Sequence, residues 1–268
     1  MTSLTPRAAA IEALLVERGT SEARKWMFNY MRGTTPFFGC KMPVTRECVR
    51  EVVLGNRKRG RDGSSERISE SYIDDAVSLL RHTHGDAKQA GAILLCEHEP
   101  SETLATVESL QRLERDVLRG PHVNDWAVAD SLGMKVFKKM WKHNASLAPI
   151  ILAWAKDENA TLWHRRCGVV AFVSYYKEQD LSEFPDDFGE QIVDACEANL
   201  LCAPDERFAQ TGTAWVTRYA LASSDDAVVQ RARAMVTRHG TLWTTEAKKS
   251  LVERLAPGSA LAREILAL

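Results

Sequence analysis

The sequence predicts an all-α protein, a right-handed α-solenoid of HEAT-like helical repeats with a concave, basic groove. Three observations support this fold class. Apolar residues recur with helical periodicity along most of the chain, and no segment shows the strict alternation of a β-strand. The joints between helical segments are short. From about residue 66 the helices fall into pairs of roughly 35 to 45 residues, the period at which two-helix repeats stack.

The helices follow from the apolar periodicity and from N-terminal capping residues. They are expected over residues 6–17, 20–32, 43–54, 66–82, 86–98, 101–118, 123–141, 146–157, 160–178, 185–201, 206–222, 225–239, 243–254 and 258–267. Residues of the types that cap helices occur at the start of several predicted helices. They are Thr20 followed by Glu22, Ser101 with Glu102, and Ser224 with Asp225 and Asp226. A helix pair cannot bury its apolar face alone, so neighbouring pairs must stack. We therefore expect a single domain over residues 1–268.

One segment interrupts the helical pattern. Residues 55–65, GNRKRGRDGSS, are charged and rich in glycine and serine, without apolar periodicity. The composition predicts a mobile basic loop. A solvated linker and a flexible basic finger that touches phosphate both remain open for this segment.

Charge and cysteine content exclude several classes of protein. With 35 Lys and Arg against 36 Asp and Glu, the chain is no polycation, so any nucleic-acid binding must come from local basic surface. The first 61 residues hold such an excess, with twelve Lys or Arg against five Glu. The six cysteines are dispersed without a CxxC pair or a zinc-like His spacing, which predicts a reducing compartment and no metal. We also expect no cofactor. No apolar run has membrane-spanning length and the start lacks a secretory pattern, so we expect a soluble intracellular protein.

The most unusual residues lie near the middle of the chain. Trp126 and Asp130 stand one helical turn apart on the same face of an otherwise apolar helix. Burying an ionised carboxylate costs several kcal/mol unless it is paired or faces a water-filled cleft. Asp130 is therefore the first candidate for a functional residue.

Two later helices combine tryptophan and arginine in the same way. Trp163 and Arg166 stand at i and i+3, as do Trp215 and Arg218, each pair within a mostly apolar run. If the three helices stand side by side, their carboxylate, guanidinium groups and indoles form one wall of a groove. Alternatively, the tryptophans are core aromatics and the two arginines are buried partners that neutralise Asp130.

A cationic stripe follows the central helix. Its lysines recur at i, i+3, i+4 and i+7 and comprise Lys135, Lys138, Lys139 and Lys142. Both a solvated helix face and a phosphate-contacting surface are compatible with this pattern.

A carboxylate flanked by indole faces suits a sugar cation as transition state. At ~4 Å and an effective dielectric constant of ~20, it would stabilise a unit positive charge by about 4 kcal/mol. An indole face adds about 1 to 2 kcal/mol. No nucleophile elbow, P-loop, HExxH or Rossmann glycine pattern offers other chemistry.

With these motifs the chain resembles the AlkD family of HEAT-like-repeat DNA glycosylases. The entry segment Tyr30–Pro43, YMRGTTPFFGCKMP, is similar to an early signature of that family, and Trp126 with Asp130 matches its tryptophan and catalytic aspartate. In the segment LWHRRC, Arg166, which follows Arg165, matches the DNA-contacting arginine of that family. In the segment AWVTRYAL, Trp215 and Arg218 match a tryptophan and an arginine on the last active-site helix of that family. The resemblance runs from about residue 24 to 240.

The resemblance implies excision of cationic N3- and N7-alkylated purines from double-stranded DNA by a monomer, without flipping the base into a pocket. Trp126 and Trp215 would pack on the deoxyribose, and Asp130 would stabilise the oxocarbenium ion and position water. Arg165, Arg166, Arg218 and the four lysines of the stripe would bind DNA phosphates.

This sequence departs from the family pattern at Ala127, where the family often has aspartate after the tryptophan, and in the segment 85–95. Two other functions remain open: a non-catalytic HEAT-like protein that binds nucleic acid, and a protein-interaction scaffold.

Overall fold

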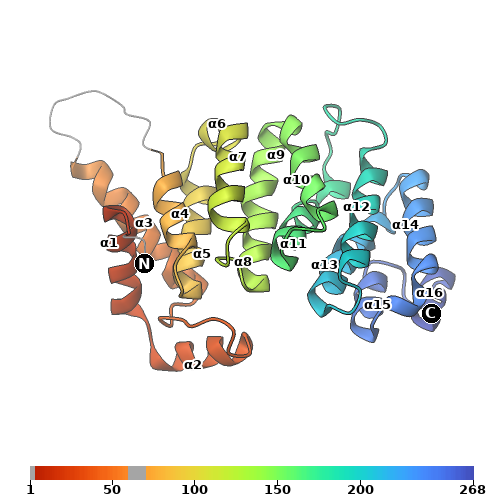
Figure 1. The fold of residues 1–268 in the computed structure, drawn as a ribbon, viewed down its shortest axis with the longest axis horizontal. Coiled ribbons are helices and arrows are strands. Elements are labelled where there is room, and N and C mark those ends of the chain that lie inside the picture. Colours follow the sequence, from red (N-terminus) through yellow and green to blue (C-terminus); the bar gives the residue numbers. More distant parts are fainter. Residues whose placement is uncertain (1–3, 60–70) are drawn as a thin grey trace. The chain divides into compact units, whose positions relative to one another are not determined.

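The computed structural model describes residues 4–59 and 71–268, which form helices joined by turns, with no strand among them (Figure 1). This confirms the all-α class, and the succession of short-jointed helices is consistent with an α-solenoid of helical repeats. The handedness and the concave basic groove stay predictions. Within the described ranges no helix has both the length and the apolar character needed to cross a bilayer.

The chain divides into two compact units, Met1–Ser131 and Leu132–Leu268. The single-domain organisation therefore stays a prediction, and each unit is described by itself. The helices of the first unit are α1 (Pro6–Arg18), α2 (Ser21–Tyr30), α3 (Met42–Arg59), α4 (Ile73–Leu80), α5 (Gly85–Ile93), η1 (Leu94–His98), α6 (Ser101–Leu104), α7 (Val107–Leu113), η2 (Glu114–Leu118) and α8 (Trp126–Ser131).

Helices of the first unit pack in two layers. α3, α5 and α8 follow one another side by side, and α4 packs against α5 as its partner. α1 closes this unit by packing on α3, α4 and α5, whereas α2 lies crosswise to these helices (Figure 1). The cap predicted at Thr20 is confirmed, since its hydroxyl accepts the backbone N–H of Ala23 at 3.2 Å and starts α2.

A buried carboxylate fixes the segment that leads from α2 to α3. Asp86, 1% exposed in the first turn of α5, accepts the backbone N–H groups of Phe38 at 3.1 Å, Gly39 at 2.9 Å and Cys40 at 3.1 Å. Gly39 has φ +106°, and a Cβ there would stand 2.2 Å from the carbonyl oxygen of Thr20. Only glycine fits this turn, so the segment has one path between the two helices.

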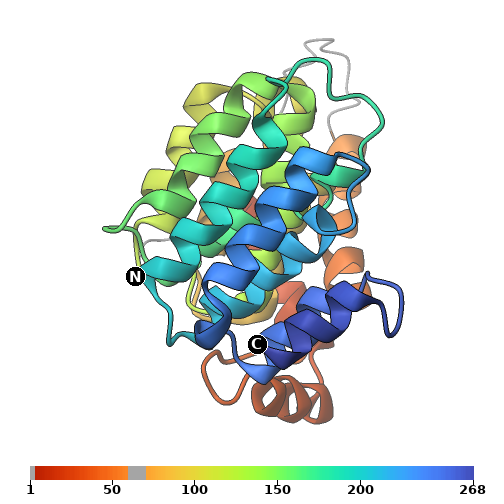
Figure 2. The ribbon, with the colours of Figure 1, turned by 90° about the vertical axis from the view of Figure 1, so that its right-hand side faces the viewer.

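The second unit repeats the layered arrangement. Its helices are η3 (Leu132–Phe137), α9 (Lys138–His143), η4 (Ala145–Leu147), α10 (Ala148–Ala153), η5 (Trp154–Lys156), α11 (Leu162–Val170), η6 (Tyr175–Lys177), α12 (Phe188–Cys202), α13 (Arg207–Ala220), α14 (Asp226–Arg238), η7 (Gly240–Leu242), α15 (Thr245–Val252) and α16 (Ala260–Ala267). One layer runs through η3, α11, α13 and α15, and the other contains α12 and α14, which lie side by side in Figure 2.

Several predicted helix boundaries were wrong. The helix expected over 101–118 is interrupted between α6, which ends at Leu104, and α7, which begins at Val107. α3 continues to Arg59, so residues 55–59 are helical and not part of a loop, because arginine and lysine favour a helix once it is nucleated. Residues 60–65 of the predicted basic loop lie outside the described part of the chain. The helix expected over 160–178 stops at Val170. The chain turns there, and the ring of Tyr175 beyond the turn packs against Phe184 and Phe188, with ring centroids 5.5 Å away in each case.

Asp86→Ala should lower the free energy of unfolding by about 2 to 4 kcal/mol, because three buried N–H groups lose their acceptor. Urea denaturation measures the difference. The matched control is Asp74→Ala, which removes a carboxylate with 65% side-chain exposure that pairs with Arg112 and should change stability by less than about 1 kcal/mol. Equal stability of the two variants would contradict the anchoring role of Asp86.

Candidate active site

The helix that carries Trp126 and Asp130 is anchored at its N-terminus by Asp125. This carboxylate is 2% exposed, accepts the hydroxyl of Thr35 at 2.8 Å, and accepts the backbone N–H of Val128 at 2.9 Å. Asp125 therefore starts α8 and ties it to the segment between α2 and α3. The sequence showed an aspartate before Trp126 but gave no sign of this distant partner.

A second clamp holds the middle of α8. Gln89 of α5 donates its side-chain amide to the carbonyl oxygen of Ala127 at 3.0 Å and accepts the hydroxyl of Ser131 at 2.7 Å. Asp130 lies between these two contacts in sequence and is half-buried. Asp130 thus lies on a helix held at two points, and the residue is partly exposed.

Trp126 belongs to a chain of aromatic rings. Its indole meets the ring of Tyr30 edge-on at 5.4 Å between centroids, and Tyr30 stacks on Trp26 at 5.2 Å with an interplanar angle of 7°. Trp26 and Tyr30 are 57% and 55% exposed. Sequence reasoning missed Trp26, although its i, i+4 spacing from Tyr30 places both rings on one face of α2.

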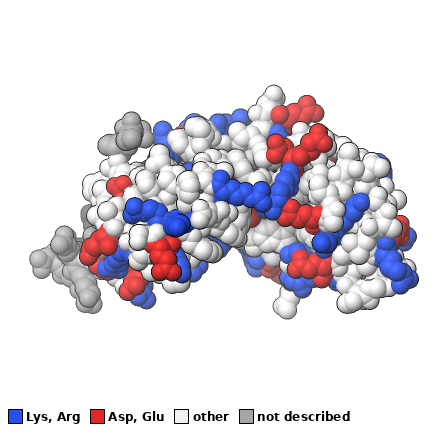
Figure 3. All heavy atoms as spheres, turned by 90° about the horizontal axis from the view of Figure 1, so that it is seen from below, with Lys and Arg blue, Asp and Glu red and all other residues white. Residues whose placement is uncertain are grey.

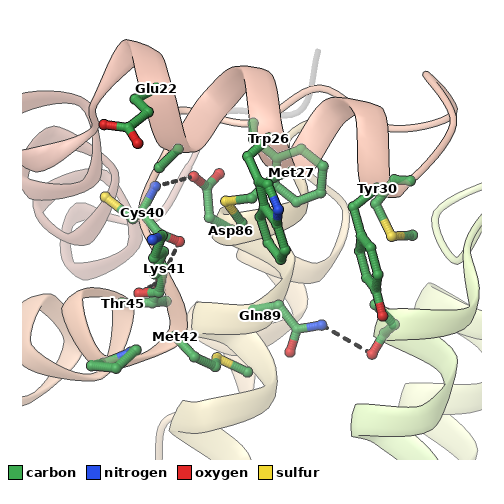
Figure 4. A pocket seen from close by; sticks show the side chains of 15 residues that line it. Glu22, Trp26, Met27, Tyr30, Cys40, Lys41, Met42, Thr45, Asp86 and Gln89 are labelled. Carbon is green, nitrogen blue, oxygen red and sulfur yellow. Dashed lines mark hydrogen bonds between the residues drawn. The ribbon is translucent and has the colours of Figure 1, made fainter.

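Beside these rings lies a cavity of about 520 Å³ (Figure 4). Trp26, Met27 and Tyr30 point into it from α2, and Ala127 of α8 contributes to its wall. Two of its polar side chains are already used, because Asp86 binds backbone N–H groups and the half-buried Gln89 binds α8. The cavity therefore offers planar and apolar surface more than hydrogen-bonding groups.

A buried lysine supports the turn before α8. Lys88 is 2% exposed and donates to the side-chain oxygen of Asn124 at 2.6 Å. Burial lowers the pKa of Lys88, and the neighbouring Asp125 opposes that shift. The buried ammonium therefore lies where the charge of Asp125 favours it.

The second unit places the predicted arginines of α11 inside the structure. Arg166 is 4% exposed and donates to the carbonyl oxygen of Phe208 at 2.7 Å, while Arg165, 7% exposed, donates to the carbonyl oxygen of Ala160. A Cβ at Gly212 would stand 2.8 Å from Nη1 of Arg166, so glycine leaves room for the guanidinium. Both arginines therefore hold backbone in this structure, and direct contacts with DNA stay predictions.

Trp215 and Arg218 lie together on α13. Both are half-buried, and Cζ of Arg218 lies 5.8 Å from the centroid of the Trp215 ring. Arg218 also forms an ion pair with the exposed carboxylate of Glu253. The structure thus brings together Trp126 with Asp130 in the first unit, and Trp215 with Arg218 in the second.

Part of the lysine stripe is neutralised by one carboxylate. Lys138 and Lys142 contact Glu178 at 3.0 and 2.5 Å. Burial raises the pKa of Glu178, but hydrogen bonds from both lysines outweigh it and lower the pKa below its ordinary value. Lys135 and Lys139 are half-buried. On the face drawn in Figure 3, cationic and anionic side chains are likewise interspersed.

Tyr219, next to Arg218, has an unusual environment that the sequence did not reveal. Burial opposes ionisation of its hydroxyl, but hydrogen bonds with Arg254, Lys177 and Arg218 outweigh burial and lower its pKa to about 8. By contrast, burial raises the pKa of Tyr175 to about 12.

We expect a spectrophotometric titration to show one tyrosinate forming near pH 8, because three cations favour the phenolate of Tyr219. The ultraviolet absorbance of tyrosinate provides the measurement. Tyr219→Phe should abolish this step, whereas Tyr30→Phe should leave it in place. If the curves of the wild type and Tyr219→Phe coincide around pH 8, the cations do not act on this hydroxyl.

Comparisons with known proteins agree with this architecture. A solved structure described as a predicted DNA alkylation repair enzyme from Enterococcus faecalis is similar in fold, with a TM-score of 0.60 and 13% sequence identity, over 90% of this chain and 98% of that one. No curated protein matches the chain. The family model described as DNA alkylation repair enzyme matches residues 11–249. Because this match spans most of the sequence, the chain belongs to the DNA alkylation repair enzyme family.

Proposed function

We propose that this member of the alkylation repair family is a DNA glycosylase that excises cationic N3- and N7-alkylated purines and leaves an abasic site. The observation that carries the proposal is the setting of Asp130. Asp130 is half-buried one helical turn from Trp126, on a helix clamped through Asp125 and Gln89. Such clamping holds a charged group in place before the reaction, which is the main requirement of electrostatic catalysis.

The chemistry needs few groups. When the bond between sugar and alkylated base breaks, positive charge moves to the sugar, and a carboxylate ~4 Å away stabilises it by about 4 kcal/mol at an effective dielectric constant of ~20. This corresponds to roughly a thousandfold in rate. The face of Trp126 would add about 1 to 2 kcal/mol. Water held by Asp130 then attacks the sugar carbon.

A cationic leaving base makes a general acid unnecessary. N3- and N7-alkylated purines carry positive charge, so the base departs as a neutral molecule without being protonated. Ordinary glycosidases use a second carboxylic acid for that step. One carboxylate on α8 therefore suffices, and the proposal needs neither a metal nor a lysine nucleophile.

DNA binding is assigned to cationic residues of the second unit. We propose that Arg218, Lys135 and Lys139 contact phosphates, and that Lys138 and Lys142 do so in exchange for Glu178. Arg166 also links α11 to α13 through the carbonyl oxygen of Phe208, and Arg165 binds the carbonyl oxygen of Ala160 just before α11. Contacts of these two arginines with DNA stay predictions. The role of Trp215 as a catalytic indole stays a prediction. We also propose that the enzyme works as a monomer inside the cell, where its DNA substrate is.

The decisive test is release of free base from duplex DNA containing 7-methylguanine. The wild type should release 7-methylguanine, and Asp130→Asn should be slower by roughly a hundredfold or more, because it loses the charge that stabilises the sugar cation. Single-turnover kinetics with chromatographic detection of the base measures the rate. Asp130→Asn should still bind the duplex.

The control is Glu108→Gln, which removes an exposed carboxylate from the first turn of α7 in the same unit. It should excise at the wild-type rate. Wild-type activity of Asp130→Asn would remove Asp130 from the mechanism. Salt-dependent duplex binding without any base release would favour a non-catalytic nucleic-acid-binding protein, and absence of both would favour a scaffold.

A further inference from the structure

Three cationic side chains converge on one tyrosine ring in the second unit. Nζ of Lys177 lies 4.1 Å from the centroid of the Tyr219 ring, Cζ of Arg254 lies 4.9 Å away, and Cζ of Arg218 lies 5.2 Å away. They come from three places in the chain: η6, the last turn of α13, and the residues after α15. The guanidinium of Arg254 also donates to the Tyr219 hydroxyl at 3.2 Å.

The charges of this cluster are poorly balanced. Among the described residues, one carboxylate pairs with it, that of Glu253 on Arg218, and this side chain is 59% exposed. Neither Lys177 nor Arg254 forms an ion pair with any carboxylate in the described part of the chain. Three positive charges within about 5 Å of one ring repel one another, so an anion would stabilise the arrangement.

The groups also have the right form for a phosphate. Arginine presents a planar fork of N–H donors to phosphate oxygens, lysine supplies a compact charge, and the tyrosine hydroxyl adds a neutral donor. Lys177 and Arg254 are exposed, so a ligand on a large molecule could reach them. Nε of Arg218 is buried and has no hydrogen-bond partner within the described ranges.

We propose that Lys177, Arg218, Tyr219 and Arg254 form a binding site for a backbone phosphate of duplex DNA. This proposal rests on the proposed function, which supplies DNA as the ligand, and it extends the DNA-binding surface to three residues that the sequence pattern did not indicate. The phosphate would displace Glu253 from Arg218 and accept a hydrogen bond from the Tyr219 hydroxyl.

The state of Tyr219 should govern the strength of this site. The charged groups that face its hydroxyl are Lys177, Arg218 and Arg254, with Glu253 behind Arg218. Below its pKa of about 8 the hydroxyl is a donor, whereas above it the phenolate neutralises one cation and repels phosphate. Phosphate binding should therefore weaken as the pH rises through 8, and bound phosphate should raise the pKa of Tyr219.

The test is binding of undamaged duplex DNA, followed by fluorescence anisotropy over a range of salt concentrations. Lys177→Gln and Arg254→Gln should each weaken binding about fivefold or more and reduce the salt slope by about 0.9, the effect of one lost phosphate contact. Glu253→Gln should tighten binding, because it frees Arg218. The matched control Arg263→Gln removes an exposed cation of the same unit that donates to the carbonyl of Gly258, and it should leave the slope unchanged.

The outcomes separate this site from the proposed function. If Lys177→Gln and Arg254→Gln bind like Arg263→Gln, the phosphate site is wrong, even when the wild type releases 7-methylguanine. If these variants lose affinity and the wild type releases no base, the phosphate site is supported and the proposed glycosylase activity is wrong. Circular dichroism checks that each surface variant is folded.

A spectroscopic experiment distinguishes a DNA phosphate from free inorganic phosphate as the ligand. Saturating duplex should raise the pH at which Tyr219 ionises, and Tyr219→Phe should bind duplex with less dependence on pH than the wild type. A shift of the Tyr219 titration by inorganic phosphate but not by duplex would overturn the assignment to DNA.

Discussion

The first unit depends on two buried carboxylates that hold the same loop from opposite ends. Asp86 gathers three backbone N–H groups of residues 38–40, and Asp125 binds the hydroxyl of Thr35. Each carboxylate stands at the start of a helix, where unpaired N–H groups and the helix dipole favour negative charge. Buried charge is tolerated here because hydrogen bonds replace the lost hydration. The loop thereby fixes the distance between α2, α5 and α8.

The position of the candidate catalytic residues follows from this anchoring. α2 lies crosswise to its neighbours and contributes few buried side chains of its own, with Ala23 as its buried residue. Its place is therefore set by the loop that follows it. Because Tyr30 at the end of α2 meets Trp126 at the start of α8, the aromatic surface and Asp130 are connected through the same hydrogen bonds.

Local features of the sequence were sufficient to predict where most helices lie, but not all of their boundaries. Apolar periodicity and caps such as Thr20 and Asp225 act within a few residues, so they can be recognised without a fold. The spacing of Trp126 and Asp130 is equally local. The contacts of Asp86, by contrast, join residues more than 45 positions apart, and the cations around Tyr219 come from three separate parts of the chain. Arg166 shows the same limit: the motif identified the residue, but only the fold reveals that it binds a backbone carbonyl of α13.

The seven tryptophans differ in burial, so their fluorescence should differ in accessibility to a quencher. Trp141, Trp154 and Trp243 are at most 4% exposed, whereas Trp26 is 57% exposed at the aromatic edge of α2. Acrylamide should therefore quench the emission of Trp26 before that of the buried indoles. A macromolecule that covers α2 would shield this one fluorophore without disturbing the others, so quenching can separate occupancy of that surface from loosening of the core.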